Sequence, residues 1–355
     1  MLKARQCVRE MREYHSPLSS PNTDLRLDMN ESTTGCSPRV LAKLNSMDAR
    51  TLAQYPRREA GEKLVADFMG VPPQQLLLTN GADEAIDLLC RAYLEPQDEI
   101  VVVVPTFAMY EVFAQMEHAK VIRVPAGSDF SFPLDRVLNA LTAKTRIVVI
   151  CNPNNPTGID VPHSAIMQII QAAPDAAILL DEAYFDFYGQ TMLDQIGKLP
   201  NLFIARTFSK AYGLAGLRLG VMIGDLEQMS VLRRMASPFN VNAFAIECLA
   251  EALADREFVA DYVAQVVASR EWLSKELEKL GFKCWPSHGN FILCRFGEEK
   301  QVILDALRAR SIALRDRPDC EGCVRVTIGK QQEMERLIAE LKQVLSQLTA
   351  NQAAR

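Results

Sequence analysis

Short apolar runs rich in β-branched residues alternate with helical patterns between about Gly70 and Gly224. This alternation is typical of a parallel sheet whose strands are joined by crossover helices. A helix is predicted over Arg58–Met69, because Gly70 can end it in a left-handed conformation and Pro72 and Pro73 prevent its continuation. The predicted strands are Leu76–Thr79, Ile100–Val104, Val121–Val124, Arg146–Cys151, Ala177–Leu180, Leu202–Ala205 and Leu219–Ile223.

The pattern changes after Asn242. Helical periodicity continues to Lys279, and two further strands, Phe291–Cys294 and Val324–Ile328, precede a closing helix. We predict that the last residues, Thr349–Arg355, fray. The closing helix has a single apolar stripe at helical spacing, which indicates one buried face, formed by Met334, Leu337, Ile338, Leu341, Leu345 and Leu348.

The length of 355 residues allows two closely packed domains of unequal size. The fold class predicted from the pattern is α/β. We predict a large domain with a mostly parallel sheet over residues 40–245. Residues 1–39 and 246–355 are predicted to form an N-terminal arm and a smaller α+β domain.

The composition argues against several classes of protein. Hydrophobic residues make up 48% of the chain, and no segment approaches the ~18 uncharged apolar residues that would cross a bilayer. The net charge of -5 provides no basic field for a nucleic acid. The first residues carry frequent charges and contain no apolar core of a secretory signal. The sequence therefore predicts a soluble protein that binds neither nucleic acid nor membrane.

Nine cysteines at irregular spacings indicate reduced thiols in the cytoplasm rather than a disulfide framework. Cys320 and Cys323 have the spacing of a redox or zinc pair. A structural zinc site needs four ligands, however, and the sequence has no second pair or nearby His. We interpret the two residues as loop thiols and predict no metal site.

Polar side chains follow two of the predicted strands. Asp181 ends the apolar run of Ala177–Leu180, and Asn155 lies in an irregular segment with two Asn-Pro steps directly after Arg146–Cys151. In open α/β sheets, ligands bind at the carboxyl edge of the strands, where a carboxylate must meet a charge or several donors. The alternative for both residues is ordinary turn or helix-cap chemistry.

A third candidate segment follows the strand Leu202–Ala205. Here Lys210 is preceded by Thr207 and Ser209 and followed eight residues later by Arg218. A desolvated Lys can lose its proton and attack carbonyl groups, and hydroxyls with an Arg are suited to holding an anion. The alternative is an exposed surface Lys.

A fourth segment, Thr79–Ile86, is a strand end followed by a turn of small residues that opens a helix. Exposed backbone N–H groups and the helix dipole at such a place form a phosphate seat. The segment lacks the glycine pattern of a dinucleotide site and the Lys of a P-loop, so it indicates neither kind of nucleotide binding. A simple capped helix is the alternative.

In chain order, these segments resemble the pyridoxal-phosphate (PLP) aminotransferases of fold type I. They read Asn-Gly-Ala-Asp-Glu, Asn-Pro-Asn-Asn-Pro-Thr-Gly, Asp-Glu-Ala-Tyr and Thr-Phe-Ser-Lys, with Arg218 eight positions after Lys210. Within that class the pattern is most similar to the histidinol-phosphate aminotransferase family. The resemblance runs from about Tyr14 to Ile338 and implies the fold-type I architecture.

The resemblance also implies roles for individual residues. Lys210 is expected to hold PLP as a Schiff base and to move the proton at the substrate Cα, and Asp181 is expected to pair with the pyridine nitrogen, which makes the ring an electron sink. Tyr55 is expected to reach the cofactor of the neighbouring subunit, which implies a homodimer. The other expected cofactor contacts are Asn155 and Tyr184 at the ring oxygen, Phe107 on the ring face, and Ala82, Asp83, Thr207, Ser209 and Arg218 at the phosphate.

For the substrate, Arg325 matches the family's anion-binding arginine, and a guanidinium suits carboxylate and phosphate equally. Arg315 matches a second family arginine, and Tyr14 is a third candidate at the same entrance. An exposed, ion-paired residue is the alternative for each. The chain departs from the family in one segment, because it has Asn30-Glu31-Ser32-Thr33 where Asn-Glu-Asn-Pro is usual.

The implied reaction is transfer of the amino group of L-histidinol phosphate to 2-oxoglutarate, giving imidazole acetol phosphate and glutamate in histidine biosynthesis. An aromatic amino-acid aminotransferase and a threonine-phosphate decarboxylase-like lyase are alternatives, because they share many of these motifs. A non-catalytic, PLP-sensing binding domain is another alternative. It would require an N-terminal helix-turn-helix domain, and only about thirty residues precede the motif region.

Overall fold

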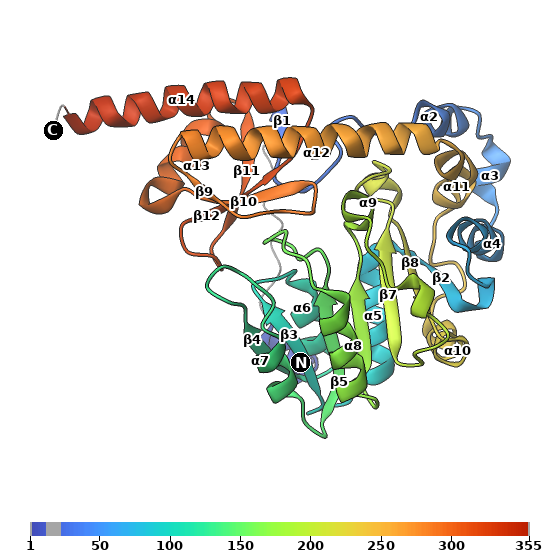
Figure 1. Cartoon of the computed structure of the whole chain (residues 1–355). Coiled ribbons are helices and arrows are strands. Elements are labelled where there is room, and N and C mark those ends of the chain that lie inside the picture. Colours follow the sequence, from blue (N-terminus) through green and yellow to red (C-terminus); the bar gives the residue numbers. More distant parts are fainter. Residues whose placement is uncertain (1, 12–22, 354–355) are drawn as a thin grey trace.

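The computed structural model describes residues 2–11 and 23–353 and contains two sheets, shown in Figure 1. In the larger sheet β8 runs antiparallel to β2 and β7, and the other neighbouring strands are parallel. Its strands, in spatial order, are β2 (Leu76–Asn80), β8 (Leu219–Gly224), β7 (Leu202–Thr207), β6 (Ala177–Asp181), β5 (Thr145–Cys151), β3 (Glu99–Val104) and β4 (Lys120–Pro125).

The larger sheet is buried on both faces, as the uninterrupted apolar strands predict. Leu179 and Phe203 lie in one apolar cluster, whereas the next residues, Leu180 and Ile204, lie in another, because successive side chains alternate between faces. The first cluster includes residues of α5 (Gly81–Tyr93), α6 (Met109–Met116) and α10 (Leu226–Met235). The second includes residues of α4 (Arg58–Met69), α7 (Leu134–Ala140), α8 (His163–Ala172) and α11 (Ala243–Ala254).

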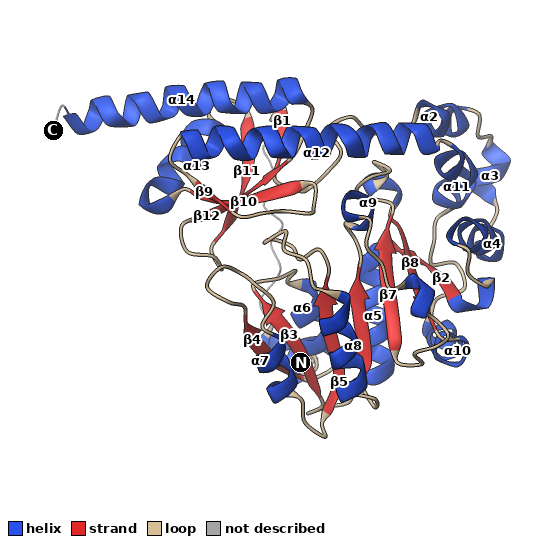
Figure 2. Cartoon of the chain, in the orientation of Figure 1, coloured by secondary structure: helices blue, strands red, loops and turns tan. Residues whose placement is uncertain are grey.

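The smaller sheet is mostly antiparallel, and only β1 and β11 form a parallel pair. Three helices pack near this sheet and against one another, and Figure 2 shows the two longest running above it. They are α12 (Arg256–Lys279), α13 (Lys300–Arg308) and α14 (Gln331–Ala353). The strands, in spatial order, are β1 (Leu25–Leu27), β11 (Ile312–Arg317), β12 (Cys323–Thr327), β10 (Phe291–Arg295) and β9 (Lys283–Cys284).

Side chains cap the N-termini of several shorter helices. Ser37 and Asp48 accept hydrogen bonds from the first turns of α2 and α3, and Asn242 does so for α11. The α4 helix ends at Gly70, whose φ of 71° is left-handed. The bounds of the short helices are α1 (Gln6–Glu10), α2 (Pro38–Asn45), α3 (Ala49–Ala53) and α9 (Phe185–Tyr188).

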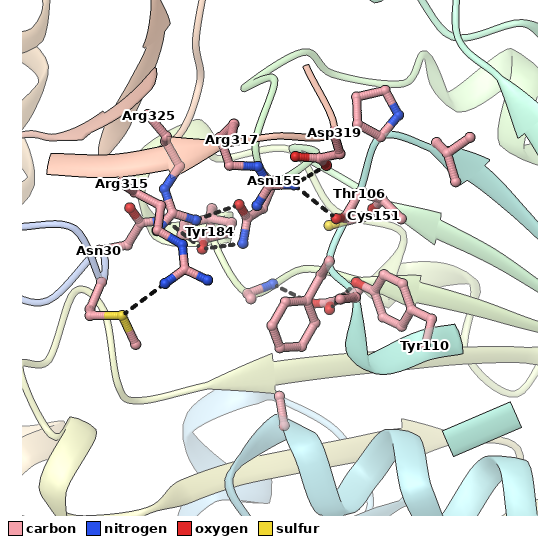
Figure 3. Close-up of a pocket in the computed structure, with 18 of the residues that line it drawn as sticks. Asn30, Thr106, Tyr110, Cys151, Asn155, Tyr184, Arg315, Arg317, Asp319 and Arg325 are labelled. Atoms are coloured by element: carbon pink, nitrogen blue, oxygen red, sulfur yellow. Dashed lines mark hydrogen bonds and ion pairs between the residues drawn. The ribbon is translucent and has the colours of Figure 1, made fainter. Parts of the chain in front are cut away.

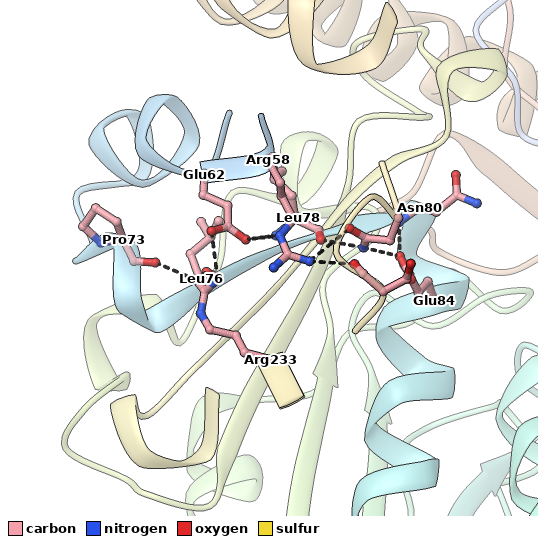
Figure 4. Close-up of polar contacts among 10 residues, drawn as sticks. Arg58, Glu62, Pro73, Leu76, Leu78, Asn80, Glu84 and Arg233 are labelled. Atoms are coloured by element: carbon pink, nitrogen blue, oxygen red, sulfur yellow. Dashed lines mark hydrogen bonds and ion pairs between the residues drawn. The ribbon is translucent and has the colours of Figure 1, made fainter. Parts of the chain in front are cut away.

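A buried charged cluster joins α4 to the edge of the larger sheet, as Figure 4 shows. Glu62 is 3% exposed, and its carboxylate lies 3.3 Å from Arg58 Nε and 2.9 Å from Arg233 Nη1. It also accepts a hydrogen bond of 3.2 Å from the backbone N–H of Leu78. The cluster therefore joins α4 and β2 to α10, which comes much later in the chain.

The structure confirms most of the predicted elements. The α4 helix has the predicted bounds, and each predicted strand of the larger sheet agrees with the observed one to within two residues. The strands β1, β9 and β11 were not predicted. The predicted fraying of the C-terminus is wrong for the described part, because α14 continues to Ala353. Within the described ranges, no helix is long and apolar enough to cross a bilayer.

Candidate active site

Three adjacent parallel strands end at one edge of the larger sheet. Cys151 of β5, Asp181 of β6 and Ala205 of β7 are in register across these strands. The segments that follow carry Asn155 and Lys210 to the same edge, where they line a cavity of about 1090 Å³ together with Asp181. The sheet topology therefore brings together the three residues that the sequence placed after separate strands.

Asp181 is buried and is held by two donors. The Tyr110 hydroxyl donates to its Oδ2 at 2.5 Å, and the Ala183 N–H donates to its Oδ1 at 2.9 Å. Burial raises the pKa of Asp181 to about 6, and these two hydrogen bonds oppose the rise. The carboxylate is therefore charged at neutral pH. Tyr110, which lies in α6, one segment after β3, was not among the predicted site residues.

Lys210 is half-buried and lines the cavity. Its Nζ donates to the Met29 carbonyl at 3.1 Å. Burial lowers the pKa of Lys210 to about 8, and the positive charge of Arg325 adds to the decrease, while Glu31 and Asp83 act against it. Such an amine loses its proton far more readily than a surface Lys, as a nucleophile or general base requires. The alternative of an exposed Lys is therefore wrong.

A hydrogen-bond network centres on Tyr184, as Figure 3 shows. Its hydroxyl oxygen accepts from Asn30 Nδ2 at 2.9 Å and from Asn155 Nδ2 at 3.3 Å. Asn155 Oδ1 in turn accepts from Arg325 Nη1 at 2.6 Å. Burial raises the pKa of Tyr184 to about 12, so the phenol stays protonated at neutral pH. Asn30 is a site residue that the sequence analysis treated only as part of a variable segment.

The start of α5 lies against the segment that follows β7. Thr207 Oγ1 donates to Ser209 Oγ at 2.9 Å, and Arg218 Nη2 lies 3.0 Å from Asp83 Oδ2. Gly81 has a φ of 78°, and a Cβ added there would lie 2.5 Å from Arg218 Nη2. Only glycine therefore allows the guanidinium to approach the helix N-terminus so closely. Ala82, Asp83, Thr207, Ser209 and Arg218 all line the cavity.

The smaller sheet contributes cationic side chains to the opposite side of the cavity. Arg315 on β11 and Arg325 on β12 are paired directly across the two strands. Like charges in such a pair destabilise a sheet, so their presence indicates a site for an anion. Arg317 lies two positions beyond Arg315, on the same side of the strand, and contacts Asp319 Oδ2 at 2.5 Å. Arg317 was not predicted.

The other predicted site residues differ in their placement. Phe107 lines the cavity, together with the unpredicted Phe130. Tyr55 is 76% exposed, does not line the cavity of its own chain, and stacks on Phe239 with 4.2 Å between ring centroids. Tyr14 lies outside the described residues. Cys320 and Cys323 are buried thiols, and all nine cysteines are free.

Comparisons with known proteins agree with this geometry. Residues 22–341 match the family described as aminotransferase class I and II. The histidinol-phosphate aminotransferase of Dehalococcoides mccartyi is 35% identical over 324 residues, which cover 89% of each chain. The enzyme of that name from Cytophaga hutchinsonii is 38% identical over 326 residues, covering 89% of this chain and 90% of the relative.

Solved structures show the same fold. The histidinol-phosphate aminotransferase of Sinorhizobium meliloti, crystallised in complex with pyridoxal-5'-phosphate, superposes with a TM-score of 0.90 at 22% identity and covers 98% of this chain and 99% of its own. The aspartate aminotransferase of Thermus thermophilus with maleate gives a TM-score of 0.81 at 20% identity, covering 97% and 100%. The predicted fold-type I architecture is confirmed.

The architecture and the strand-edge site thus define an aminotransferase of fold type I. The chain belongs to the aminotransferase class I and II family. The prediction that it is an aminotransferase enzyme is confirmed.

Proposed function

We propose that this enzyme transfers the amino group of L-histidinol phosphate to 2-oxoglutarate, with PLP bound at Lys210. The observation that carries the proposal is that the amine of Lys210 and the buried carboxylate of Asp181 line one cavity, whose other side presents Arg315 and Arg325. The names of the curated relatives support the choice of amino donor.

The residues at the site fit PLP. The anion seat at the start of α5 is built around Gly81, where a side chain would collide with Arg218, and it suits a phosphate ester. Asp181 is charged at neutral pH and can hold a proton on a pyridine nitrogen. Asn155 and Tyr184 can donate hydrogen bonds to a ring oxygen, and Phe107 lines the cavity where it can cover a ring face.

When bound, PLP supplies an electron-withdrawing ring that stabilises negative charge on the substrate Cα. Lys210 Nζ takes the proton from that Cα, and its lowered pKa of about 8 makes the neutral amine accessible near neutral pH. Asp181 keeps the ring nitrogen protonated. Its Tyr110 and Ala183 donors stabilise the charged carboxylate that this task requires.

The arginines orient the substrate. Arg325 Nη1 is anchored by Asn155 Oδ1, which fixes the position of its guanidinium relative to the cofactor contacts. Arg315, directly across the strand pair, adds a second positive charge, and together they suit the dianionic phosphate of the donor. Tyr14 remains the proposed third contact. The aromatic Phe107 and Phe130 give the cavity an apolar wall for the imidazole.

We also propose a cytoplasmic homodimer in which Tyr55 completes the neighbouring subunit's site. Tyr55 and Phe239 form an exposed aromatic stack, an arrangement that is costly in water and typical of an interface. Because Tyr55 does not line its own chain's cavity, its expected contact with a cofactor requires a second copy. The absence of any disulfide among the nine cysteines supports a reducing compartment.

A single-turnover experiment tests the proposed donor. Histidinol phosphate, glutamate, phenylalanine and threonine phosphate are added separately to the PLP-loaded enzyme, and conversion to pyridoxamine phosphate is followed by absorbance. Rapid conversion by histidinol phosphate and glutamate is expected. Conversion by phenylalanine but not by histidinol phosphate would assign an aromatic aminotransferase instead, and release of carbon dioxide from threonine phosphate would assign a decarboxylase.

A further inference from the structure

Asn30 joins the two halves of the site, although it lies in neither the larger sheet nor the arginine pair. It follows β1 of the smaller sheet by three residues, and its side chain reaches Tyr184, 154 positions away, after β6 of the larger sheet. Asn30 is 1% exposed and has a φ of 53°, a left-handed conformation that non-glycine residues rarely adopt. Asn tolerates this conformation better than most other side chains, so the backbone here favours Asn or Gly.

Each polar atom of Asn30 has a hydrogen-bond partner. Its N–H donates to Thr327 Oγ1 at 3.0 Å, and its carbonyl accepts from Asn290 Nδ2 at 3.1 Å. The Thr327 hydroxyl donates its own proton to Asn30 Oδ1 at 3.1 Å. This contact fixes the orientation of the amide, because the oxygen faces Thr327 and only the nitrogen can face Tyr184.

The second amide at Tyr184 is fixed in the same way. Arginine can only donate, so the Asn155 atom that contacts Arg325 must be oxygen, and the Asn155 nitrogen faces Tyr184. Two amide N–H groups therefore donate to the same phenol oxygen and occupy both of its acceptor positions. The phenol's own proton must then point in a third direction. Because Tyr184 lines the cavity, that direction leads towards the bound ligand.

We propose that Asn30 is a positioning residue that aims the Tyr184 hydroxyl proton into the cavity and thereby sets the protonation equilibrium at Lys210 Nζ in the PLP-bound enzyme. The inference rests on the proposed PLP site but not on the identity of the amino donor. Asn30 acts through Tyr184, since its amide nitrogen donates to the phenol while its amide oxygen accepts from Thr327.

The direction of the effect follows from charge. By donating to the cofactor's ring oxygen, Tyr184 stabilises the negative charge that is left uncompensated when Lys210 Nζ loses its proton. A correctly aimed proton therefore lowers the pH midpoint of the absorbance change of the lysine-bound cofactor. The charged and titratable groups that face Tyr184 are Arg325, Cys151 and Asp181, and those that face Lys210 are Arg325, Glu31, Asp83 and Arg218.

The substitution Asn30→Asp tests this proposal with almost no change of shape. An oxygen replaces the amide nitrogen, so Tyr184 must donate its proton to Asp instead of to the cofactor. The pH midpoint of the PLP-loaded enzyme, measured without substrate, is expected to rise by about one unit. Asn30→Gly, which keeps the left-handed backbone but removes the amide, is expected to raise it by less. This second variant also carries the test if Asn30→Asp does not fold.

A double-mutant cycle with Tyr184→Phe separates positioning from the added charge. If Asn30 acts through the phenol, Asn30→Asp shifts the midpoint far less in the Tyr184→Phe background than in the wild type. A direct effect of the new carboxylate would instead give equal shifts in both backgrounds, and that result would overturn the proposal. An unchanged midpoint in both Asn30 variants would overturn it as well.

Asn152→Asp is the matched control for structural damage. Asn152 is a buried amide in the segment after β5, but its side chain bonds only the backbone of Val161 and does not line the cavity. Its substitution is expected to lower thermal stability with little effect on the midpoint. If Asn152→Asp shifts the pH midpoint as much as Asn30→Asp does, general loosening of the structure is enough to cause the shift. That result would contradict the proposed role of Asn30. Failure of the wild-type enzyme to bind PLP would instead contradict the proposed function.

Discussion

The two sides of the cavity are built in different ways. On the larger sheet, Asp181 and Lys210 are single charged groups, buried and half-buried respectively where parallel strands end, with pKa values displaced towards neutrality. On the smaller sheet, Arg315 and Arg325 form a concentrated positive charge across two antiparallel strands. Desolvation on one side therefore prepares groups to exchange protons, while clustering of arginines on the other prepares groups to hold anions.

The largest expected effect comes from the proton-exchanging side. Lys210→Ala removes the only amine proposed to bind PLP and to act at the substrate Cα. Turnover is expected to fall at least ~10³-fold, with loss of the visible absorbance of the bound cofactor. Steady-state assays and absorbance spectra measure both effects. Lys198→Ala, at an exposed position, serves as the control, and near-normal turnover in Lys210→Ala would refute the mechanism.

Removal of the anchored arginine is expected to have the next largest effect. Arg325→Gln eliminates a buried charge and its bond to Asn155, so kcat/KM for histidinol phosphate is expected to fall about 10²- to 10³-fold. Arg295→Gln, an exposed position on the neighbouring β10, should leave the kinetics intact. Equal losses in the two variants would mean that net charge, not the specific contact, governs binding.

A smaller effect, confined to acid pH, is expected for Tyr110→Phe. Burial raises the pKa of Asp181 to about 6, and the Tyr110 hydroxyl limits this rise by stabilising the charged form. Without that donor the pKa rises further, so the carboxylate becomes protonated at a higher pH. The acid limb of the pH–rate profile is expected to move up by about one unit, with little change above pH ~8. If the acid limb does not move, the titration of Asp181 does not determine it.

The smallest effect on turnover is expected for a buried charge outside the cavity. Glu62→Gln leaves Arg58 and Arg233 without their shared carboxylate, which is expected to lower the free energy of unfolding by about 3–5 kcal/mol. Activity below the unfolding temperature should remain. Asp67→Asn, which breaks an exposed ion pair with Lys63 on the same helix, should have little effect on either property. A kinetic defect in Glu62→Gln would instead show that this cluster on α4 contributes to catalysis.

The larger sheet and part of its site could be predicted from the sequence, whereas other site residues could not. The strands of the larger sheet and the residues after them were predictable, because apolar runs mark buried strands and parallel topology brings their carboxyl ends together. That rule makes Asp181 and Lys210 candidates, and the resemblance to the aminotransferases favours them over a turn carboxylate and a surface Lys. Asn30 and Tyr110 could not be predicted in this way, since their roles come from single hydrogen bonds between distant segments. Short strands such as β1 and β9 carry too little periodicity to be recognised.

The division between the two sides is tested most directly by measuring two constants in two variants. The Kd of PLP is measured by titration of the apoenzyme, and half-saturation by histidinol phosphate is measured on the loaded enzyme. Arg218→Gln is expected to raise the Kd of PLP about tenfold or more and to leave half-saturation by histidinol phosphate nearly unchanged, whereas Arg315→Gln does the reverse. If either variant changes both constants by similar factors, the separation of cofactor binding from substrate binding is contradicted.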